Sequence, residues 1–263
     1  MKKYCMVLSL AGVMAAQNLF AAMSVILIDD TSKYSYANGG EFRAVGNTGL
    51  DAAVDWSAYS SSASGTISAA DLSSWGGGSV SVGQAYFQTF CIEYNEEFSP
   101  GASYSVGISQ NAMYGNNPPL GDPISIGTAW LYSHFAAGTL SGYNYAYGGS
   151  RTGPAGLLQQ AIWWLEAEPN GVRDSFIDTA EDALYGGHGA AQDALIVGNS
   201  NGAYGVAVLN LGAAGQVQDQ LVIVPGDQHL PAVPEPGTVI AGVLLLLPFG
   251  ASTLRILRRN RMA

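Results

Sequence analysis

The chain has 263 residues, 34 glycines and a formal net charge of −10. All 20 acidic residues lie between Asp29 and Glu235, and only four basic residues accompany them there. Such an interior repels nucleic acid and anionic lipid, so nucleic-acid binding is excluded. The aromatic and β-branched content also excludes a chain that never folds.

The first 24 residues have the pattern of a secretory signal peptide. Two lysines precede an apolar run at residues 6–16, and small residues follow at 21–24. We expect cleavage near Ala22-Met23-Ser24. Cys5 would leave with this segment, so the exported chain would keep one cysteine, Cys91, and no intrachain disulfide.

The body of the chain, residues 25–224, changes from strand to helix and back. Val25 to Ile28 and Glu41 to Val45 are expected strands, 57–83 are expected loops with a weak hairpin, and further strands are expected at 85–94, 103–109, 203–211 and 216–224. Helices are expected from the Asp122-Pro123 step to residue 137, from Pro154 to 168, and over 174–185. The order predicts an α+β domain: a β-sandwich or barrel-like sheet with an inserted helical subdomain.

The C-terminal segment resembles a membrane-targeted sorting signal. After a linker at 225–233, residues 238–254 form a run of 17 without a charge, which is at the lower limit for crossing a bilayer. Four arginines follow this run: Arg255, Arg258, Arg259 and Arg261. By the positive-inside rule they would lie in the cytoplasm, with the body of the protein outside.

Residues 234–263 combine three features in a fixed order. Pro234, Glu235 and Pro236 come first, then the apolar helix, then the arginines. This order resembles the PEP-CTERM sorting signal. The resemblance implies recognition by an exosortase, cleavage near the Pro-Glu-Pro motif, and release to the cell surface or extracellular matrix. The two prolines would keep the cleavage segment extended.

Conventional catalytic motifs are absent from the sequence. We find no nucleophile elbow, phosphate loop or dinucleotide fingerprint, and no histidine or cysteine spacing typical of a metal site. We therefore expect a protein that is not an enzyme and has no catalytic residues, metal or cofactor.

The stretches FCIE at 90–93 and LQQAIW at 158–163 resemble motifs of the bacterial surface thioester domain. The resemblance implies that Cys91 forms an internal thioester with Gln159, supported by Ala161, Ile162 and Trp163. Leu158 stands where the motif has threonine. A thioester of this kind would react with an amine on a host, cell-surface or matrix ligand. Glu93 and His134 are candidates for proton transfer.

Two functions therefore remain open, while the absence of a nucleophile–base or paired-acid set disfavours a third, a secreted hydrolase. The first is an exosortase-sorted adhesin with a covalent thioester. The second is a structural matrix component with the same fold, in which Cys91 is a small buried hydrophobe.

Replacing Pro234, Glu235 and Pro236 by alanine is expected to leave an uncleaved precursor held in the membrane, because the processing enzyme would lose its recognition segment. Cell fractionation and immunoblotting measure this. Deletion of residues 237–263 is the comparison and should release the folded body. Normal processing and location of the triple variant would contradict the sorting hypothesis.

Overall fold

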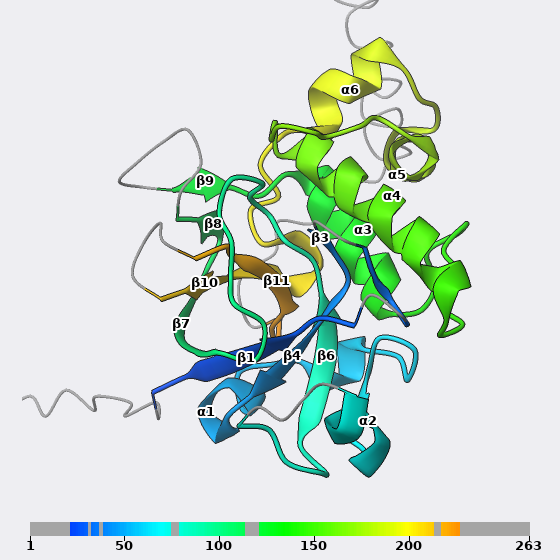
Figure 1. The fold of residues 1–263 in the computed structure, drawn as a ribbon. Coiled ribbons are helices and arrows are strands. Elements are labelled where there is room, and N and C mark those ends of the chain that lie inside the picture. Colours follow the sequence, from blue (N-terminus) through cyan, green and yellow to red (C-terminus); the bar gives the residue numbers. More distant parts are fainter. Residues whose placement is uncertain are drawn as a thin grey trace, which may run out of the picture.

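The computed structural model describes residues 22–30, 33–36, 39–74, 79–113, 121–212 and 217–226. They form a large antiparallel sheet and a group of helices, which confirms the α+β class (Figure 1). Residues 1–21 of the signal peptide and the whole sorting segment 234–263 lie outside these residues. In the part that is described, no helix is long and apolar enough to cross a membrane.

The main sheet has seven strands in the order β11-β10-β7-β1-β4-β6-β5, and its neighbours pair antiparallel. The strands of this sheet are β1 Ser24–Ile28, β4 Phe42–Gly46, β5 Ser64–Thr66, β6 Ala85–Thr89, β7 Ser103–Ser109, β10 Val206–Leu211 and β11 Gln220–Ile223. Two short ladders stand apart from it: β2 Ser35–Tyr36 with β3 Gly39–Gly40, and β8 Asn111–Ala112 with β9 Asp122–Pro123.

The helices fall into two groups. Figure 1 shows α3, α4, α5 and α6 together at the upper right, while α1 and α2 lie below the sheet. Their bounds are α1 Thr48–Asp51, α2 Ala69–Ser74, α3 Ile126–Ala136, α4 Gly149–Leu165, α5 Ser175–Tyr185 and α6 Ala190–Ile196, with 3₁₀ turns at Trp56–Ala58 and Ala203–Gly205.

Two predicted helix starts were wrong. The Asp122-Pro123 step belongs to β9, and α3 begins three residues later because the Ser125 hydroxyl accepts a hydrogen bond from the Thr128 N–H at 3.0 Å. Pro154 lies inside α4 rather than at its start. The earlier turns of α4 contain Arg151, whose side chain is buried and bound to Glu41.

The predicted strand at 85–94 is shorter than expected. β6 ends at Thr89, and Cys91 makes only an isolated antiparallel bridge with Gln220. On either side of this bridge the Ile92 N–H donates to the Asp219 carbonyl at 3.1 Å, and the Leu221 N–H donates to the Phe90 carbonyl at 3.2 Å. The chain after β6 therefore pairs with β11, which lies at the other end of the strand order. This pairing joins the two ends of the sheet.

Helix α3 covers this link from the core side. The Tyr132 hydroxyl lies 3.0 Å from the Gln88 carbonyl and 3.1 Å from the Leu221 carbonyl, so it contacts both of the linked segments. Phe135 packs edge-to-face on Phe90 at 4.9 Å between ring centroids. Each of these five residues is fully buried, and together they make the link part of the hydrophobic core.

A buried ion pair fastens the start of α4 to the sheet. Arg151 and Glu41 are both fully buried, and the guanidinium binds the carboxylate through two nitrogens. The Tyr143 hydroxyl donates to the same carboxylate, and Arg151 also donates to the main-chain carbonyls of Tyr145 and Ser62. Glu41 directly follows β3, so the pair also anchors the β2–β3 hairpin.

Glu41→Ala is expected to lower the free energy of unfolding by about 3–5 kcal/mol, because it leaves the buried Arg151 cation without a carboxylate. Urea unfolding followed by circular dichroism measures this. Asp182→Asn is the control, since Asp182 is exposed and pairs with the exposed His188, and it should leave stability almost unchanged. Equal stability of the two variants would contradict the anchoring role.

Candidate functional site

Cys91 lies where the two ends of the sheet meet. It is a free cysteine, completely buried, directly after Phe90 and opposite Gln220 in the isolated bridge. The hydrogen bonds of the link belong to the residues on either side of this pair and not to Cys91 or Gln220 themselves. Cys91 and Gln220 are therefore a non-hydrogen-bonded pair, the antiparallel arrangement in which side chains on the same face come closest.

The side chain of Gln220 lies against the sulfur. Its Nε2 is 3.4 Å from Cys91 Sγ, and Gln220 is also completely buried. The same nitrogen is 3.4 Å from the Gln218 carbonyl, while Gln220 Oε1 is buried without a hydrogen-bond partner in the described structure. Leaving such an oxygen unpaired costs about 1–3 kcal/mol, which marks Gln220 as unusual for a core residue.

Gln159 approaches Cys91 from the other side. In a non-hydrogen-bonded pair the N–H and C=O of a residue point away from the partner strand. Gln159 binds both of these groups: its Oε1 accepts from the Cys91 N–H at 3.0 Å, and its Nε2 donates to the Cys91 carbonyl at 2.8 Å. The side-chain amide thus takes the place that another strand would occupy.

The β2–β3 hairpin completes the hydrogen bonding of Gln159. The Gly40 N–H donates to Gln159 Oε1 at 2.9 Å, so this oxygen has two main-chain donors. Gly39 and Gly40 have φ angles of +148° and +104°, which favour glycine. A Cβ on Gly39 would also lie 2.6 Å from the Trp163 ring and 2.9 Å from Gln159 Cγ. The two glycines allow the hairpin to approach α4.

The other residues of the predicted motif pack around this centre. Ala161 and Ile162 are completely buried in the hydrophobic core. Trp163 packs against Gly39 and edge-to-face on Tyr94, at 5.0 Å between centroids. They hold α4 in place and make no contact with the sulfur that the structure describes.

The two candidates for proton transfer have different surroundings. Glu93 is buried, and its carboxylate accepts from the Asp219 N–H at 2.8 Å. Its negative charge contributes to the raised pKa of the Cys91 thiol. His134 instead stacks on Trp130 at 3.9 Å between ring centroids, and its Nδ1 lies 2.9 Å from the carbonyl of the same residue. Its described contacts do not include Cys91, Gln159 or Gln220.

Burial raises the pKa of the Cys91 thiol far above its usual range, and the charges of Glu93 and Asp29 raise it further, while the hydrogen bond from Gln220 opposes them. At neutral pH the sulfur is therefore protonated, and a free Cys91 would be a poor nucleophile toward reagents in solution. Any reaction at this sulfur has to take place with a group that the fold already holds against it.

The site thus contains the Cys91 thiol and two side-chain amides. The amide of Gln220 lies against the sulfur, and the amide of Gln159 binds the main chain of Cys91. In the part of the chain that is described, no group of three or more histidine, cysteine or acidic residues is arranged to hold a metal ion. The sorting residues and the four C-terminal arginines lie outside the described residues.

Comparison with protein-family models, curated proteins and solved structures finds no match to this chain. The assignment of a function therefore depends on the sequence motifs and on the geometry around Cys91.

Sequence reasoning selected Gln159 and missed Gln220. The structure brings Gln159 to Cys91, but to its main chain, whereas Gln220 is the residue that contacts the sulfur. The available signal was weak: Gln220 is the last of three alternating glutamines in QVQDQ, directly before the apolar run LVIV.

Gln159→Ala is expected to lower the free energy of unfolding by about 2–4 kcal/mol, because it leaves the buried N–H and C=O of Cys91 unpaired. Chemical denaturation of both variants tests this, with Gln160→Ala as the control, since Gln160 is the half-buried neighbour on the same helix. A Gln159 variant as stable as the Gln160 variant would contradict the role of Gln159 as a substitute strand.

Proposed function

We propose that this protein is an exported surface or matrix protein, not an enzyme, in which Cys91 and Gln220 form an internal thioester that reacts with an amine on a ligand. The observation that carries the proposal is the contact between Gln220 Nε2 and Cys91 Sγ, at 3.4 Å, between two completely buried side chains. A thiol held against a carboxamide has the two groups that an internal thioester requires.

Gln220 is a better acyl donor than Gln159 for a geometric reason. Cys91 and Gln220 are directly opposite in an antiparallel bridge, so their side chains project to the same face. The Gln159 amide is bound to the main-chain edge of Cys91 by two hydrogen bonds and to Gly40 by a third. Gln159 then orients Cys91, while Gln220 supplies the carbonyl carbon.

The reaction balances within this pair. The Cys91 sulfur attacks Cδ of Gln220, the S–C bond forms, the C–N bond breaks, and Nε2 leaves as ammonia with the thiol proton. As the carbon becomes tetrahedral the nitrogen becomes a basic amine, so it can take that proton although the pKa of the thiol is raised. Amides are weak electrophiles, but preorganised neighbours reach effective molarities of roughly 10⁵–10⁸ M.

The cellular destination rests on the two ends of the sequence. The signal peptide at 1–24 supports export, and the order of Pro234-Glu235-Pro236, the apolar segment and the arginines supports sorting by an exosortase with a temporary membrane anchor. An exported protein with a single free cysteine would expose it to oxidation, and complete burial or a thioester would each protect the sulfur.

A second function has one observation in its favour. Cys91 is completely buried beside Phe90 and Ile92, as expected for a small core residue. If no covalent bond forms, the same fold would serve as a non-covalent component of an extracellular polysaccharide matrix.

Intact-mass measurement tests the covalent proposal. Protein purified at neutral pH without amines is expected to be lighter by one ammonia and to show no titratable thiol after gentle denaturation. Methylamine should restore the thiol and label the peptide that contains Gln220. Cys91→Ala and Gln220→Ala should remove the mass loss, whereas Gln160→Ala should keep it.

The outcomes separate the alternatives. Methylamine on the Gln159 peptide would overturn the choice of Gln220 and leave the thioester standing with the partner that the motif predicts. A full-mass protein with one buried thiol would overturn the thioester and leave the non-covalent function. Circular dichroism of each variant distinguishes lost chemistry from lost folding.

A further inference from the structure

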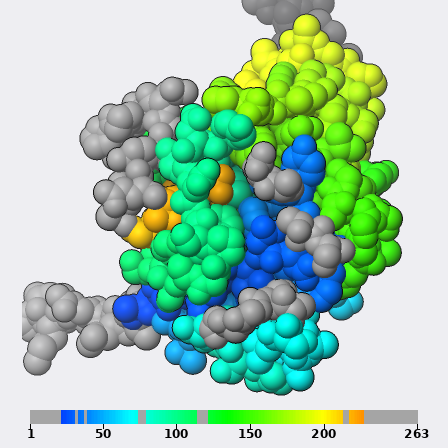
Figure 2. Space-filling view, in the orientation of Figure 1, coloured from blue at the N-terminus to red at the C-terminus, as the bar shows by residue number. Residues whose placement is uncertain are grey.

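The proposed thioester would be closed to solvent unless a path leads to it. Cys91, Gln159 and Gln220 are each completely buried. A cleft of about 430 Å³ lies beside them, bordered by Asp29, Glu96 and Glu97, and we call it the acidic cleft. On the face in Figure 2, its lining comes mainly from the blue N-terminal strands and the green-cyan segment that follows Cys91.

The acidic cleft shares its walls with the buried centre. Gly39 lines the cleft and also packs against Gln159 and Trp163. Gln218 lines it from the other side and is the residue whose carbonyl lies 3.4 Å from Gln220 Nε2. The cleft and the buried centre therefore have Gly39 and Gln218 in common as wall residues.

The charge of the cleft is negative and is not balanced locally. Among the residues that the structure describes, no basic residue lines it. In the described part of the chain each basic side chain pairs with carboxylates elsewhere: Lys33 with Asp30 and Asp71, Arg43 with Asp71, Arg151 with Glu41, and Arg173 with Asp178, Glu181 and Asp193.

Two carboxylates of the cleft have raised pKa values. Burial raises the pKa of Asp29, a hydrogen bond with Ser35 opposes this, and Asp29 Oδ1 is a buried atom with no hydrogen-bond partner in the described structure. Burial raises the pKa of Glu96 as well, followed by the negative charges of Glu168 and Asp219. A cation in the cleft would relieve this crowding of negative charge.

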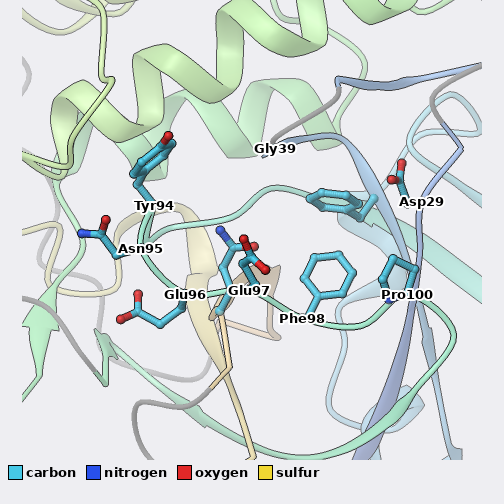
Figure 3. Close-up of a pocket in the computed structure, with 10 residues that line it drawn as sticks. Asp29, Gly39, Tyr94, Asn95, Glu96, Glu97, Phe98 and Pro100 are labelled. Atoms are coloured by element: carbon cyan, nitrogen blue, oxygen red, sulfur yellow. The ribbon is translucent and has the colours of Figure 1, made fainter.

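Aromatic rings stand between the carboxylates. Phe98 lies between Glu97 and Asp29 in the view of Figure 3, and it packs edge-to-face on Phe42 at 4.8 Å between ring centroids. Tyr94 lines the same cleft toward α4. Ring faces beside carboxylates suit an ammonium group on an aliphatic stem, since the rings contact the methylenes and attract the cation.

We propose that the acidic cleft admits a cationic primary amine, such as a lysine side chain, and guides it to the acyl carbon of Gln220. This inference rests on the proposed thioester. The ammonium loses one proton to solvent, and its nitrogen attacks Cδ of Gln220. The C–N bond forms, the C–S bond breaks, and the second proton of the amine goes to the sulfur. The products are an amide and a free Cys91 thiol.

Competing nucleophiles test the charge selection. The probes are Nα-acetyl-lysine methylamide, which is cationic at neutral pH, and hydroxylamine, which is neutral there. In thioester-containing protein, Glu96→Gln with Glu97→Gln is expected to slow the reaction of the lysine probe at least about fivefold at low salt, and less at high salt. The rate with hydroxylamine should stay within about twofold of the parent rate, because the carboxylates of the cleft do not attract a neutral nucleophile.

A matched control removes the same charge elsewhere. Asp178→Asn with Asp182→Asn neutralises two carboxylates of α5 that do not line the cleft, and it should leave both rates as in the parent protein. Mass spectrometry of the thioester and the amine adduct follows each reaction.

An unchanged rate of the lysine probe in the Glu96→Gln, Glu97→Gln variant would overturn the inference, and so would three other results. Equal slowing of both probes would mean that the glutamates only support the fold, and equal slowing in the control would mean that total charge alone acts. Neither of these two results would contradict the thioester itself. A full-mass parent protein would overturn the inference together with the proposed function.

Discussion

The antiparallel bridge between Cys91 and Gln220 is the contact on which the rest of the site depends. It links the chain after β6 to β11, which stand far apart in the strand order, and the two main-chain hydrogen bonds beside it set the register. A shift of one residue in this register would turn both side chains to the opposite face. The same pairing that links the sheet therefore decides which side chain meets the sulfur.

The surroundings of this bridge explain why it holds. Tyr132 of α3 binds carbonyls on both linked segments, and Gln159 of α4 satisfies the main-chain groups of Cys91 that point away from β11. Buried main-chain groups are rarely left unpaired, because each would cost about 1–3 kcal/mol. The helices thus complete a sheet edge that has no further strand, and they do so through side chains.

This arrangement separates two roles that one glutamine was expected to fill. The Gln159 amide makes three hydrogen bonds to main-chain groups, which hold it at the main-chain edge of Cys91. Gln220 has an unpaired carbonyl oxygen and an amide nitrogen against the thiol, so it is the side chain in direct contact with the sulfur. The acidic cleft, which shares Gly39 and Gln218 with the surroundings of these amides, adds a negative field beside the buried centre.

Much of the architecture could be predicted from the sequence by itself. Local patterns located β1, β4, β7 and α5, because strand alternation and helix caps depend on neighbouring residues. The uneven charge and the approach of Gln159 to Cys91 also follow from the residues and their motifs. The start of α3 was misplaced because Ser125, not the preceding proline, caps it.

Only the tertiary structure decided that Gln220 faces Cys91. The two residues are 129 positions apart, and their contact depends on a strand register that no local pattern encodes. The acidic cleft has the same origin, since Asp29 and Glu96 lie on separate segments and become neighbours only when the sheet folds. A short motif identifies residues that a helix or strand holds together, whereas long-range pairing brings the sulfur, the amide and the cleft to one place.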